Sequence, residues 1–372
     1  MLYIQQKILG LFCLLSVNAV GQNTVAKIDS ILQAAHKNKA INGNILIARA
    51  GNIVLEKSFG YSNMENQLPL NEKSQFQIAS VSKQFTAFGI MVLKKQGQLK
   101  YDDPVNKFLP LFPYNNITVR HLLLHTSGLP NFWNNIRPFL DTTKSNGNNE
   151  MLAYLYSKKL PLQFEPGEKW EYADIGYDIL ATIIEKVSGM SYQRFMYKKV
   201  FKPAGLKHTT ALLVTDFRRI KASNLATGYI EDSITGYVKA HEAKNFVFYL
   251  GDFYGDGSVI STARDLNKWD DVLRKYLQDD SVHFSEAYTP IYKKDGSVYE
   301  IQKGVSYGFG WGLRNETPLG KQYSHSGGHP GFITNYYRYP DKEIVLIVCR
   351  NIDTKNSFGP YLTAIRNEIN NL

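Results

Sequence analysis

The strongest constraint on the fold is a set of strand-like segments at the two ends of the chain. Near the N-terminus, Asn44 to Arg49 and Ile53 to Lys57 flank Ala50-Gly51-Asn52, which predicts a β-hairpin. Further strand patterns come late, at 307–313, 321–326, 332–339 and 343–350. Because the connections between these late strands are short, they permit antiparallel pairing, and the hairpin can join them in one sheet.

Helical patterns lie outside and between these two groups of strands. Residues 24–39 and 360–369 predict helices at the two ends of the mature chain, which can pack on the sheet. Between the strand groups, helical patterns at 119–124, 151–155 and 175–187 alternate with loops rich in proline and glycine. We therefore expect an α+β fold in which an antiparallel sheet, flanked by N- and C-terminal helices, carries a large and mostly helical insertion.

This pattern also predicts a division of the chain. Residues 22–79 and 264–372 would form the sheet subdomain, and residues 80–263 would form the mostly helical subdomain. Within the insertion, residues 145–149 are rich in glycine and asparagine, and we expect them to form a loop without a packing role.

The first residues indicate export from the cytoplasm. Lys7 precedes the apolar run Ile8 to Val17, and small residues follow up to Gly21, which predicts a signal peptide over residues 1–21 cleaved near Gly21. A membrane anchor would need about 20 apolar residues, and this run is about half that length. A lipoprotein would use Cys13, but the bulky Phe12 before it argues against that alternative. We expect a secreted or periplasmic protein.

Composition and charge exclude several other classes. The chain of 372 residues is 44% apolar and 20% charged, which is typical of a globular protein with a full core, and no later apolar stretch approaches the length of a membrane span. After cleavage only Cys349 remains, so no intrachain disulfide is possible. The net charge of +10 is spread along the chain, which argues against nucleic-acid binding and leaves open an attraction to anionic cell-envelope polymers.

The segment Ser80-Val81-Ser82-Lys83 carries a catalytic pattern. Ser80 is the only serine with a lysine at the third position after it, and this spacing places both side chains on one face of a helical turn. At a helix N-terminus the dipole disfavours an ammonium and favours a nearby oxyanion, so Lys83 could lose its proton and deprotonate Ser80. The pattern indicates an activated nucleophile.

Two later stretches offer the other groups that attack on a carbonyl requires. Tyr172 falls in a loop just before a predicted helix, where a nearby ammonium could lower its pKa and let it transfer protons, although a tyrosine commonly serves only to pack. His325 lies at the end of a predicted strand followed by Ser326-Gly327-Gly328, whose glycines let backbone N–H groups approach a ligand. His325 could be a cation that binds a substrate carboxylate or steadies the proton transfer; the alternative is a surface turn.

Other candidate sites have weaker support. His121 and His125 have the spacing of two metal ligands on a helix, but no third ligand is evident, so we interpret both as structural and expect no metal and no cofactor. Ser306 lies in a G-x-S-x-G match and is a rival nucleophile. That motif needs a strand before it, a helix after it, and then an acid and a histidine later in the chain. A glycine-rich strand follows Ser306, and Glu316 lies too close to His325 for a separate loop.

Three of these stretches together resemble a known family. Ser80-Val81-Ser82-Lys83, Tyr172-Ala173-Asp174 and His325-Ser326-Gly327 are similar to the three ordered motifs of the serine β-lactamase and penicillin-binding family, of the class C type, which includes D-stereospecific peptidases and esterases. The similarity covers nearly all of the mature chain, including 121–130, 166–177, 257–266 and 307–312. It implies a β-lactamase/transpeptidase-like fold.

The resemblance also implies roles for single residues. Ser80 would be the acylated nucleophile, Lys83 its proton partner, and Tyr172 the group that exchanges protons with Ser80, the leaving group and the deacylating water. The backbone N–H groups of Ser80 and Gly328 would hold the oxyanion. His325 stands where many relatives have lysine.

The same resemblance would place Asp174, Ser326 and Gly327 at the bound substrate. Relatives usually have asparagine where this chain has Asp174. An asparagine can donate a hydrogen bond to a substrate carbonyl, whereas an ionised aspartate only accepts. A carboxylate near Lys83 would also stabilise the protonated lysine and shift the work of the base to Tyr172. These arguments speak against typical penicillin or cephalosporin turnover, and we hypothesise that Asp174 favours substrates with a free amino group.

We therefore expect a metal-independent serine hydrolase that cleaves an amide or ester bond through an acyl-enzyme on Ser80. The leading substrate is a small peptide of the cell wall or one containing D-amino acids, as for a D-alanyl-D-alanine carboxypeptidase. The alternatives are a carboxylesterase or β-lactamase acting on small esters or β-lactams, and a penicillin-recognising sensor or binding protein without turnover.

Overall fold

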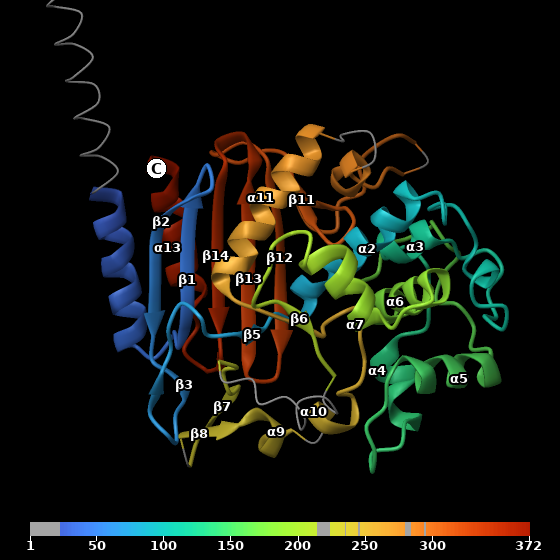
Figure 1. Cartoon of the computed structure of the whole chain (residues 1–372), viewed down its shortest axis with the longest axis horizontal. Helices are drawn as coiled ribbons and strands as arrows, with labels where there is room; N and C mark the ends of the chain where they lie inside the picture. The colour runs from blue at the N-terminus through green and yellow to red at the C-terminus, as the bar shows by residue number, and fades with distance from the viewer. Residues whose placement is uncertain (1–22, 214–223, 235, 245, 280–283, 294) are drawn as a thin grey trace, which may run out of the picture.

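The computed structural model describes residues 23–213, 224–234, 236–244, 246–279, 284–293 and 295–372. The predicted signal peptide over 1–21 lies outside the described residues. A central sheet stands upright with helices on both faces, and a largely helical region lies to one side of it (Figure 1). The predicted α+β class is confirmed.

The central sheet joins the two ends of the chain. Its seven strands are arranged in the order β10-β11-β12-β13-β14-β1-β2, and every neighbouring pair is antiparallel. The strands are β1 (Gly43–Arg49), β2 (Asn52–Phe59), β10 (Ser306–Tyr307), β11 (Gly312–Arg314), β12 (Gln322–His329), β13 (Phe332–Tyr339) and β14 (Ile344–Arg350). The N-terminal hairpin therefore pairs with the late strands through β1 and β14, as the sequence predicted.

One of the predicted strands is wrong. The segment 307–313 was expected to be continuous, but it is divided between β10 and β11 by a tight turn. The Gly308 amide donates to the Trp311 carbonyl across this turn, and Gly310 adopts φ +78°, which a residue with a side chain rarely does. The conformation that glycine allows there reverses the chain within the predicted strand.

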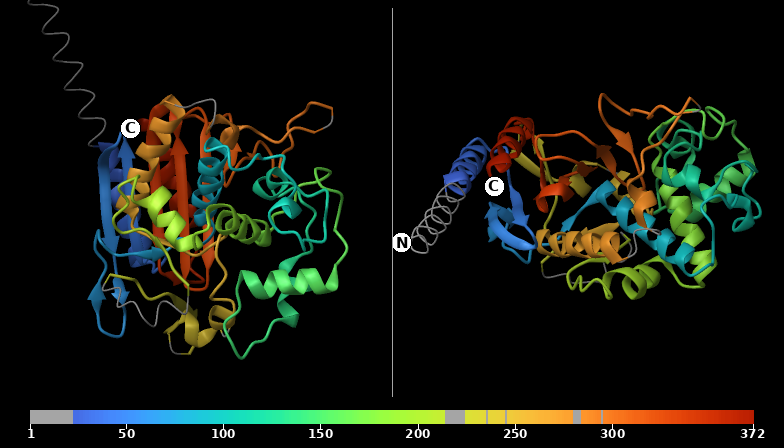
Figure 2. Two further views of the ribbon diagram at one scale, coloured as in Figure 1. Left: turned by 45° about the vertical axis from the view of Figure 1, so that its right-hand side comes forward. Right: turned by 90° about the horizontal axis from the view of Figure 1, so that it is seen from above.

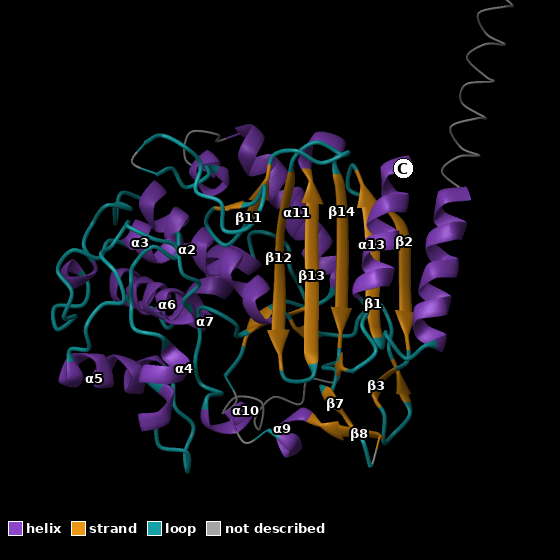
Figure 3. Cartoon of the chain, turned by 180° about the vertical axis from the view of Figure 1, so that it is seen from behind, coloured by secondary structure: helices purple, strands orange, loops and turns teal. Residues whose placement is uncertain are grey.

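Both faces of the central sheet are covered by helices. Alternate side chains of β1 point to opposite faces: Ile45 and Ile47 pack with the N-terminal helix, residues 23–37, and with α13 (Gly359–Glu368). Leu46 and Ala48 face α11 (Ala263–Asp279) on the other side. Figure 3 shows the two terminal helices over the face turned away from the viewer in Figure 1. The predicted flanking helices are confirmed.

The helical region contains the helices expected from sequence. Figure 2 shows it beside the sheet when the molecule is seen from above. Its described α-helices are α2 (Lys83–Lys95), α3 (Val119–Leu123), α4 (Phe132–Asn135), α5 (Asn148–Lys158), α6 (Asp174–Ser188) and α7 (Tyr192–Phe195), which continues into a π-helix, Met196–Phe201. The short helices α9 (Ala240–Ala243) and α10 (Phe246–Tyr249) lie at the bottom of the view in Figure 1. The predictions at 119–124, 151–155 and 175–187 correspond to α3, α5 and α6.

Short strands of two to four residues form three small sheets, and strands of this length carry too few alternations for periodicity to indicate them. They are β3 (Tyr61–Asn63) with β4 (Leu68–Pro69), β5 (Phe76–Gln77) with β9 (Val259–Ser261) and β6 (Thr210–Ala211), and β7 (Tyr229–Asp232) with β8 (Gly236–Lys239) and β15 (Ile352–Asp353). Of these strands, β5 directly precedes the Ser80 turn, and its pairing with β9 positions that turn.

The prediction that 145–149 has no packing role is also wrong. Asn146 and Asn148 are buried, and their side-chain amides donate to backbone carbonyls of distant segments. Asn146 Nδ2 lies 2.9 Å from the Tyr249 carbonyl, and Asn148 Nδ2 lies 2.8 Å from that of Asp178. A buried carbonyl without a partner is costly, so these amides have a structural reason to be in the interior.

Among the described residues, no helix combines the length and the apolar character needed to cross a membrane.

Candidate active site

Ser80 lies on a tight turn between a short strand and a long helix. After β5, Ala79 adopts the left-handed φ of +47°, and residues Ala79–Ser82 form a 3₁₀ turn that leads into α2 at Lys83. The spacing predicts Ser80 in the first turn of an α-helix, but the turn is 3₁₀, which brings residues i and i+3 into line more directly. Lys83 Nζ accordingly donates to Ser80 Oγ over 3.1 Å.

The Lys83 ammonium is fully buried among acidic groups. Nζ donates to Asp174 Oδ1 at 2.7 Å and to the Asp256 carbonyl at 3.2 Å, and it lies 4.0 Å from Asp256 Oδ2. Burial alone would lower the pKa of Lys83, but the neighbouring Asp174, and more weakly Asp256, outweigh it and raise that pKa well above its usual range. The expectation that Lys83 sheds its proton is therefore wrong for the free protein, whereas a charged Lys83 beside Asp174 is what the aspartate predicted.

Tyr172 lies in the loop immediately before α6, as predicted. The Lys83 ammonium is 4.9 Å from the centre of its ring, and Lys83 and Ser80 both act on the hydroxyl to lower its pKa. Burial raises the pKa of Tyr172, the Asp174 charge adds to that rise, and the Lys83 ammonium only partly opposes it. The expected lowering of the Tyr172 pKa is thus wrong, because loss of hydration outweighs the nearby cation.

Behind Tyr172, two histidines are joined by a tyrosine. His125 is fully buried, with its ring 4.4 Å from that of Tyr172. Its Nδ1 accepts from the Ala173 amide at 3.1 Å, so the proton of the neutral ring is on Nε2, which donates to Tyr307 Oη at 3.2 Å. Tyr307 then donates to His325 Nε2 at 3.0 Å, and His325 Nδ1–H donates to the Ser326 carbonyl at 2.6 Å. Within this series of hydrogen bonds, one placement of the protons gives each histidine nitrogen and the Tyr307 hydroxyl a partner.

This arrangement corrects the predicted role of His325. Withdrawal from water, together with the Lys83 charge, lowers the pKa of His325 to about 4, and burial lowers the pKa of His125 well below its usual range. Both rings are neutral near neutral pH, and both nitrogens of His325 already have partners. His325 is therefore not a cation that binds a carboxylate; it belongs to the network that supports Tyr172.

The two glycines after His325 have different surroundings. A Cβ on Gly327 would meet the Ile78 carbonyl oxygen at 2.1 Å and the Ser80 nitrogen at 3.0 Å, so only glycine lets β12 pass this close to the nucleophile's backbone. A Cβ on Gly328 would meet no atom within 4 Å. Gly328 lines the same cavity as Ser80, the position that the predicted oxyanion role requires, whereas Ser326 and Gly327 do not line it.

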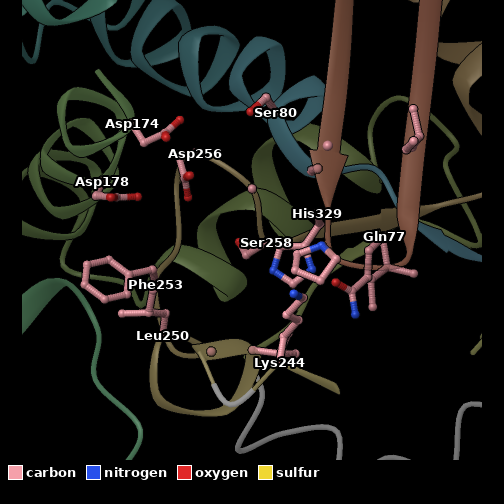
Figure 4. A pocket seen from close by; sticks show the side chains of 18 of the residues that line it. Gln77, Ser80, Asp174, Asp178, Lys244, Leu250, Phe253, Asp256, Ser258 and His329 are labelled. Carbon is pink, nitrogen blue, oxygen red and sulfur yellow. The ribbon is translucent and has the colours of Figure 1, made fainter. Parts of the chain in front are cut away.

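Ser80 opens into a cavity of about 610 Å³ (Figure 4). The carboxyl groups of Asp174, Asp178 and Asp256 gather on one side of it, and Gln77, Lys244 and His329 lie on the other. The described residues contain no group of three or more histidine, cysteine or acidic side chains arranged to hold a metal ion.

Sequence reasoning missed four residues of this site. His125 was interpreted as structural, and Tyr307 was noted only within a family motif, because nothing in their spacing shows that the two rings meet. Asp178 could have been found, since it follows Asp174 by one turn of α6 and therefore shares its face. Asp256 lies in a glycine-rich loop far along the chain, and only the fold brings it to Lys83.

The rival nucleophile is excluded by its surroundings. Ser306 is buried in β10, and its hydroxyl accepts a hydrogen bond from the Ile291 amide at 3.2 Å. The strand β11 follows it, where a nucleophile elbow needs a helix. Its neighbour Tyr307, not Ser306, is the residue that reaches the site.

Comparison with known proteins identifies the family. The beta-lactamase family model matches residues 28–371, nearly the whole chain. The chain belongs to the beta-lactamase family, a family of serine hydrolases. It is 38% identical over 339 residues to the Bacillus subtilis protein named penicillin-binding protein 4*, covering 89% of this chain and 72% of that one. It is 28% identical to the putative penicillin-binding protein PbpX of the same organism, covering 91% of this chain and 80% of the relative.

Solved structures show the same fold. A penicillin binding protein from Bacillus halodurans matches with a TM-score of 0.76 at 24% identity, covering 91% of this chain and 98% of that one. The octameric penicillin-binding protein homologue from Pyrococcus abyssi matches with a TM-score of 0.75 at 28% identity, covering 91% of this chain and 77% of the other. The β-lactamase/transpeptidase-like fold implied by the three motifs is confirmed.

Proposed function

We propose that this member of the beta-lactamase family hydrolyses an amide or ester bond through an acyl-enzyme on Ser80. The observation that carries the proposal is the Ser80 hydroxyl, which lies 3.1 Å from a buried ammonium, beside Tyr172, and opens to the cavity. A hydroxyl held between two proton-exchanging groups is the arrangement that nucleophilic catalysis needs.

Lys83 and Tyr172 act as one titrating unit in this mechanism. With Lys83 charged and Tyr172 protonated, the resting pair has no base, so it must first lose one proton. The deprotonated pair then takes the Ser80 proton as Oγ attacks the substrate carbonyl and delivers that proton to the leaving group. Backbone N–H groups of Ser80 and Gly328 would hold the oxyanion, and water would repeat the sequence in reverse to release the acid.

The proposed substrate is a peptide of the cell wall or one that contains D-amino acids, as for a D-alanyl-D-alanine carboxypeptidase. The similarity to a relative named as a penicillin-binding protein supports it, and so does a cavity with both acidic and basic side chains. The predicted signal peptide supports action outside the cytoplasm, secreted or in the periplasm. A carboxylesterase or β-lactamase acting on small esters or β-lactams is the second candidate, because the same nucleophile serves both.

A substrate panel tests the proposal. The mature protein and Ser80→Ala are incubated with a D-Ala-D-Ala peptide, p-nitrophenyl acetate and a fluorescent penicillin, and released product is counted per enzyme. Many turnovers of the peptide, absent in Ser80→Ala, support the peptidase; turnover of the ester alone supports the esterase. Stoichiometric penicillin labelling without product would replace the enzyme with a sensor. Equal turnover by Ser80→Ala would refute the mechanism.

A further inference from the structure

The cavity contains an acidic pair that the hydrolytic mechanism does not use. Asp178 comes from α6 and Asp256 from the loop before β9, and both line the cavity beside Ser80 (Figure 4). Asp178 is only 2% exposed, and its Oδ1 has no hydrogen-bond partner among the described residues. A buried carboxyl oxygen without a partner costs free energy unless a ligand satisfies it.

The charges around this pair do not balance within the protein. The Lys83 ammonium is 2.7 Å from Asp174 and 4.0 Å from Asp256, so Asp174 is its closest counter-ion. In the part of the chain that the structure describes, no cation forms an ion pair with Asp178. Burial raises the pKa of Asp178 well above its usual range, and the neighbouring Asp256 raises it further. In the free protein Asp178 therefore keeps a proton and shares it with Asp256. A cation placed between the two carboxyls would replace that proton.

We propose that Asp178 and Asp256 form a subsite for the ammonium of the substrate, so that the enzyme prefers amides and esters of amino acids or peptides whose α-amino group is free. This inference rests on the proposed hydrolysis at Ser80. Among the substrates proposed for that site, it favours small peptides and esters with a free amine next to the reacting carbonyl over the blocked peptide that a D-alanyl-D-alanine carboxypeptidase cleaves. The sequence suggested that Asp174 contacts the substrate amine. We assign that contact to Asp178 and Asp256 because Asp174 is already paired with Lys83.

The distances fit an amino group next to the reacting carbonyl. Lys83 Nζ is 3.1 Å from Ser80 Oγ and 4.0 Å from Asp256 Oδ2. The nearer carboxyl of the acidic pair and the nucleophile therefore both lie close to the same ammonium. An α-amino nitrogen is two bonds from the carbonyl carbon that Ser80 would attack. Phe253 and Leu250 line the cavity next to Asp178, where an apolar substrate side chain could pack (Figure 4).

Paired substrates test the subsite. Wild type, Asp178→Asn and the surface control Asp295→Asn are assayed with phenylalanine p-nitroanilide in both enantiomers, with the N-acetylated counterparts, and with uncharged p-nitrophenyl acetate. The asparagine is isosteric and can still donate to Asp256. We expect wild type and Asp295→Asn to prefer the free amine, and Asp178→Asn to lose kcat/KM on that substrate by about 30-fold or more, since a buried charge partner is removed. The measure is the ratio of kcat/KM on the free-amine substrate to that on p-nitrophenyl acetate, because any general effect of the substitution on Ser80 and Lys83 lowers both. An Asp178→Asn variant that lowers both equally would overturn the subsite.

A second measurement does not depend on the folding of a variant. Benzylamine and benzyl alcohol are compared as inhibitors of p-nitrophenyl acetate hydrolysis by the wild type. The amine should bind at least about tenfold more tightly, the gain expected from hydrogen bonds to charged groups.

The outcomes separate two failures. Equal wild-type rates on free and acetylated substrates, or equal inhibition by the amine and the alcohol, would overturn the subsite while Ser80-dependent ester hydrolysis still upheld the proposed function. Ester hydrolysis that persists in Ser80→Ala would overturn the function, and the subsite with it.

Discussion

Replacing Asp174 by asparagine should move the acidic limb of the pH–rate profile to lower pH. Asp174 is the closest counter-ion of Lys83, with 2.7 Å between Nζ and Oδ1, and its charge also raises the pKa of Tyr172. Removing this one charge lowers the pKa values of both members of the titrating pair. The deprotonated pair that can accept the Ser80 proton then forms at lower pH.

The size of this shift follows from the surroundings of Asp174. Two unit charges about 4 Å apart interact by about 4 kcal/mol at an effective dielectric constant of about 20, equivalent to roughly three pH units. The Asp174 side chain is 30% exposed, and Asp256 remains 4.0 Å from the ammonium after the substitution. Screening and the remaining carboxylate reduce the expected shift to about one to two units.

The assay is kcat/KM against pH for the best substrate of the panel, because this parameter reports the ionisation of the free enzyme. Asp295→Asn serves as the control for loss of one surface carboxylate. The reasoning would be refuted by an acidic limb that stays in place in Asp174→Asn, or that moves to higher pH, since either result would mean that Asp174 does not hold the proton on the pair.

Three other perturbations have defined outcomes. Tyr307→Phe should lower the free energy of unfolding by about 1–3 kcal/mol, because it leaves buried histidine nitrogens without a partner, and it should also lower kcat. Urea unfolding and steady-state kinetics measure these two effects, and unchanged values would contradict the proposed network. Gly327→Ala should unfold or inactivate the protein because its Cβ overlaps the Ile78 carbonyl, whereas Gly328→Ala, which meets open space, should fold; comparable melting temperatures of the two variants would contradict this. The pKa of His325 in the folded state, about 4, lies below its ordinary value of 6.5, so the unfolded chain binds a proton first as the pH falls. The free energy of unfolding should therefore decrease as the pH falls from 6.5 to about 4. Urea midpoints that stay constant across this interval would count against a neutral His325.

The architecture followed from sequence where an apolar pattern was long. The strands around Ile45 and Ile347 are continuous apolar runs, the helix Asp174–Ser188 repeats its apolar spacing over several turns, and each lies where it was predicted. Two-residue strands such as β5 carry no period, and the turn at Gly310 interrupts an apolar run without changing its composition. These features depend on tertiary contacts that a local pattern does not contain.

The candidate site was predictable as a set of motifs but not as an electrostatic environment. The spacing of Ser80 and Lys83 indicated their contact, and Asp174 indicated a charged lysine. The pKa of Tyr172 was expected with the wrong sign, and His325 was considered as a cation, because both properties depend on how far the ring is removed from water. Burial of a single side chain is set by segments distant in sequence.

The positions of His125 and Asp256 show the same limit. His125 reaches Tyr307 from another segment far along the chain, and Asp256 reaches Lys83 from a loop 173 residues away. Only the closed fold reveals that these side chains share one site.

The most direct test of the central claim is the location of a covalent adduct. Mature wild-type protein is incubated with penicillin, a p-nitrophenyl ester and a D-Ala-D-Ala peptide, quenched in acid, and analysed by intact mass and by peptide mapping, with Ser80→Ala in parallel. We expect one acyl group per chain, on the peptide that contains Ser80, and no adduct in Ser80→Ala. An adduct that persists in Ser80→Ala, or that maps to Ser306, would contradict it.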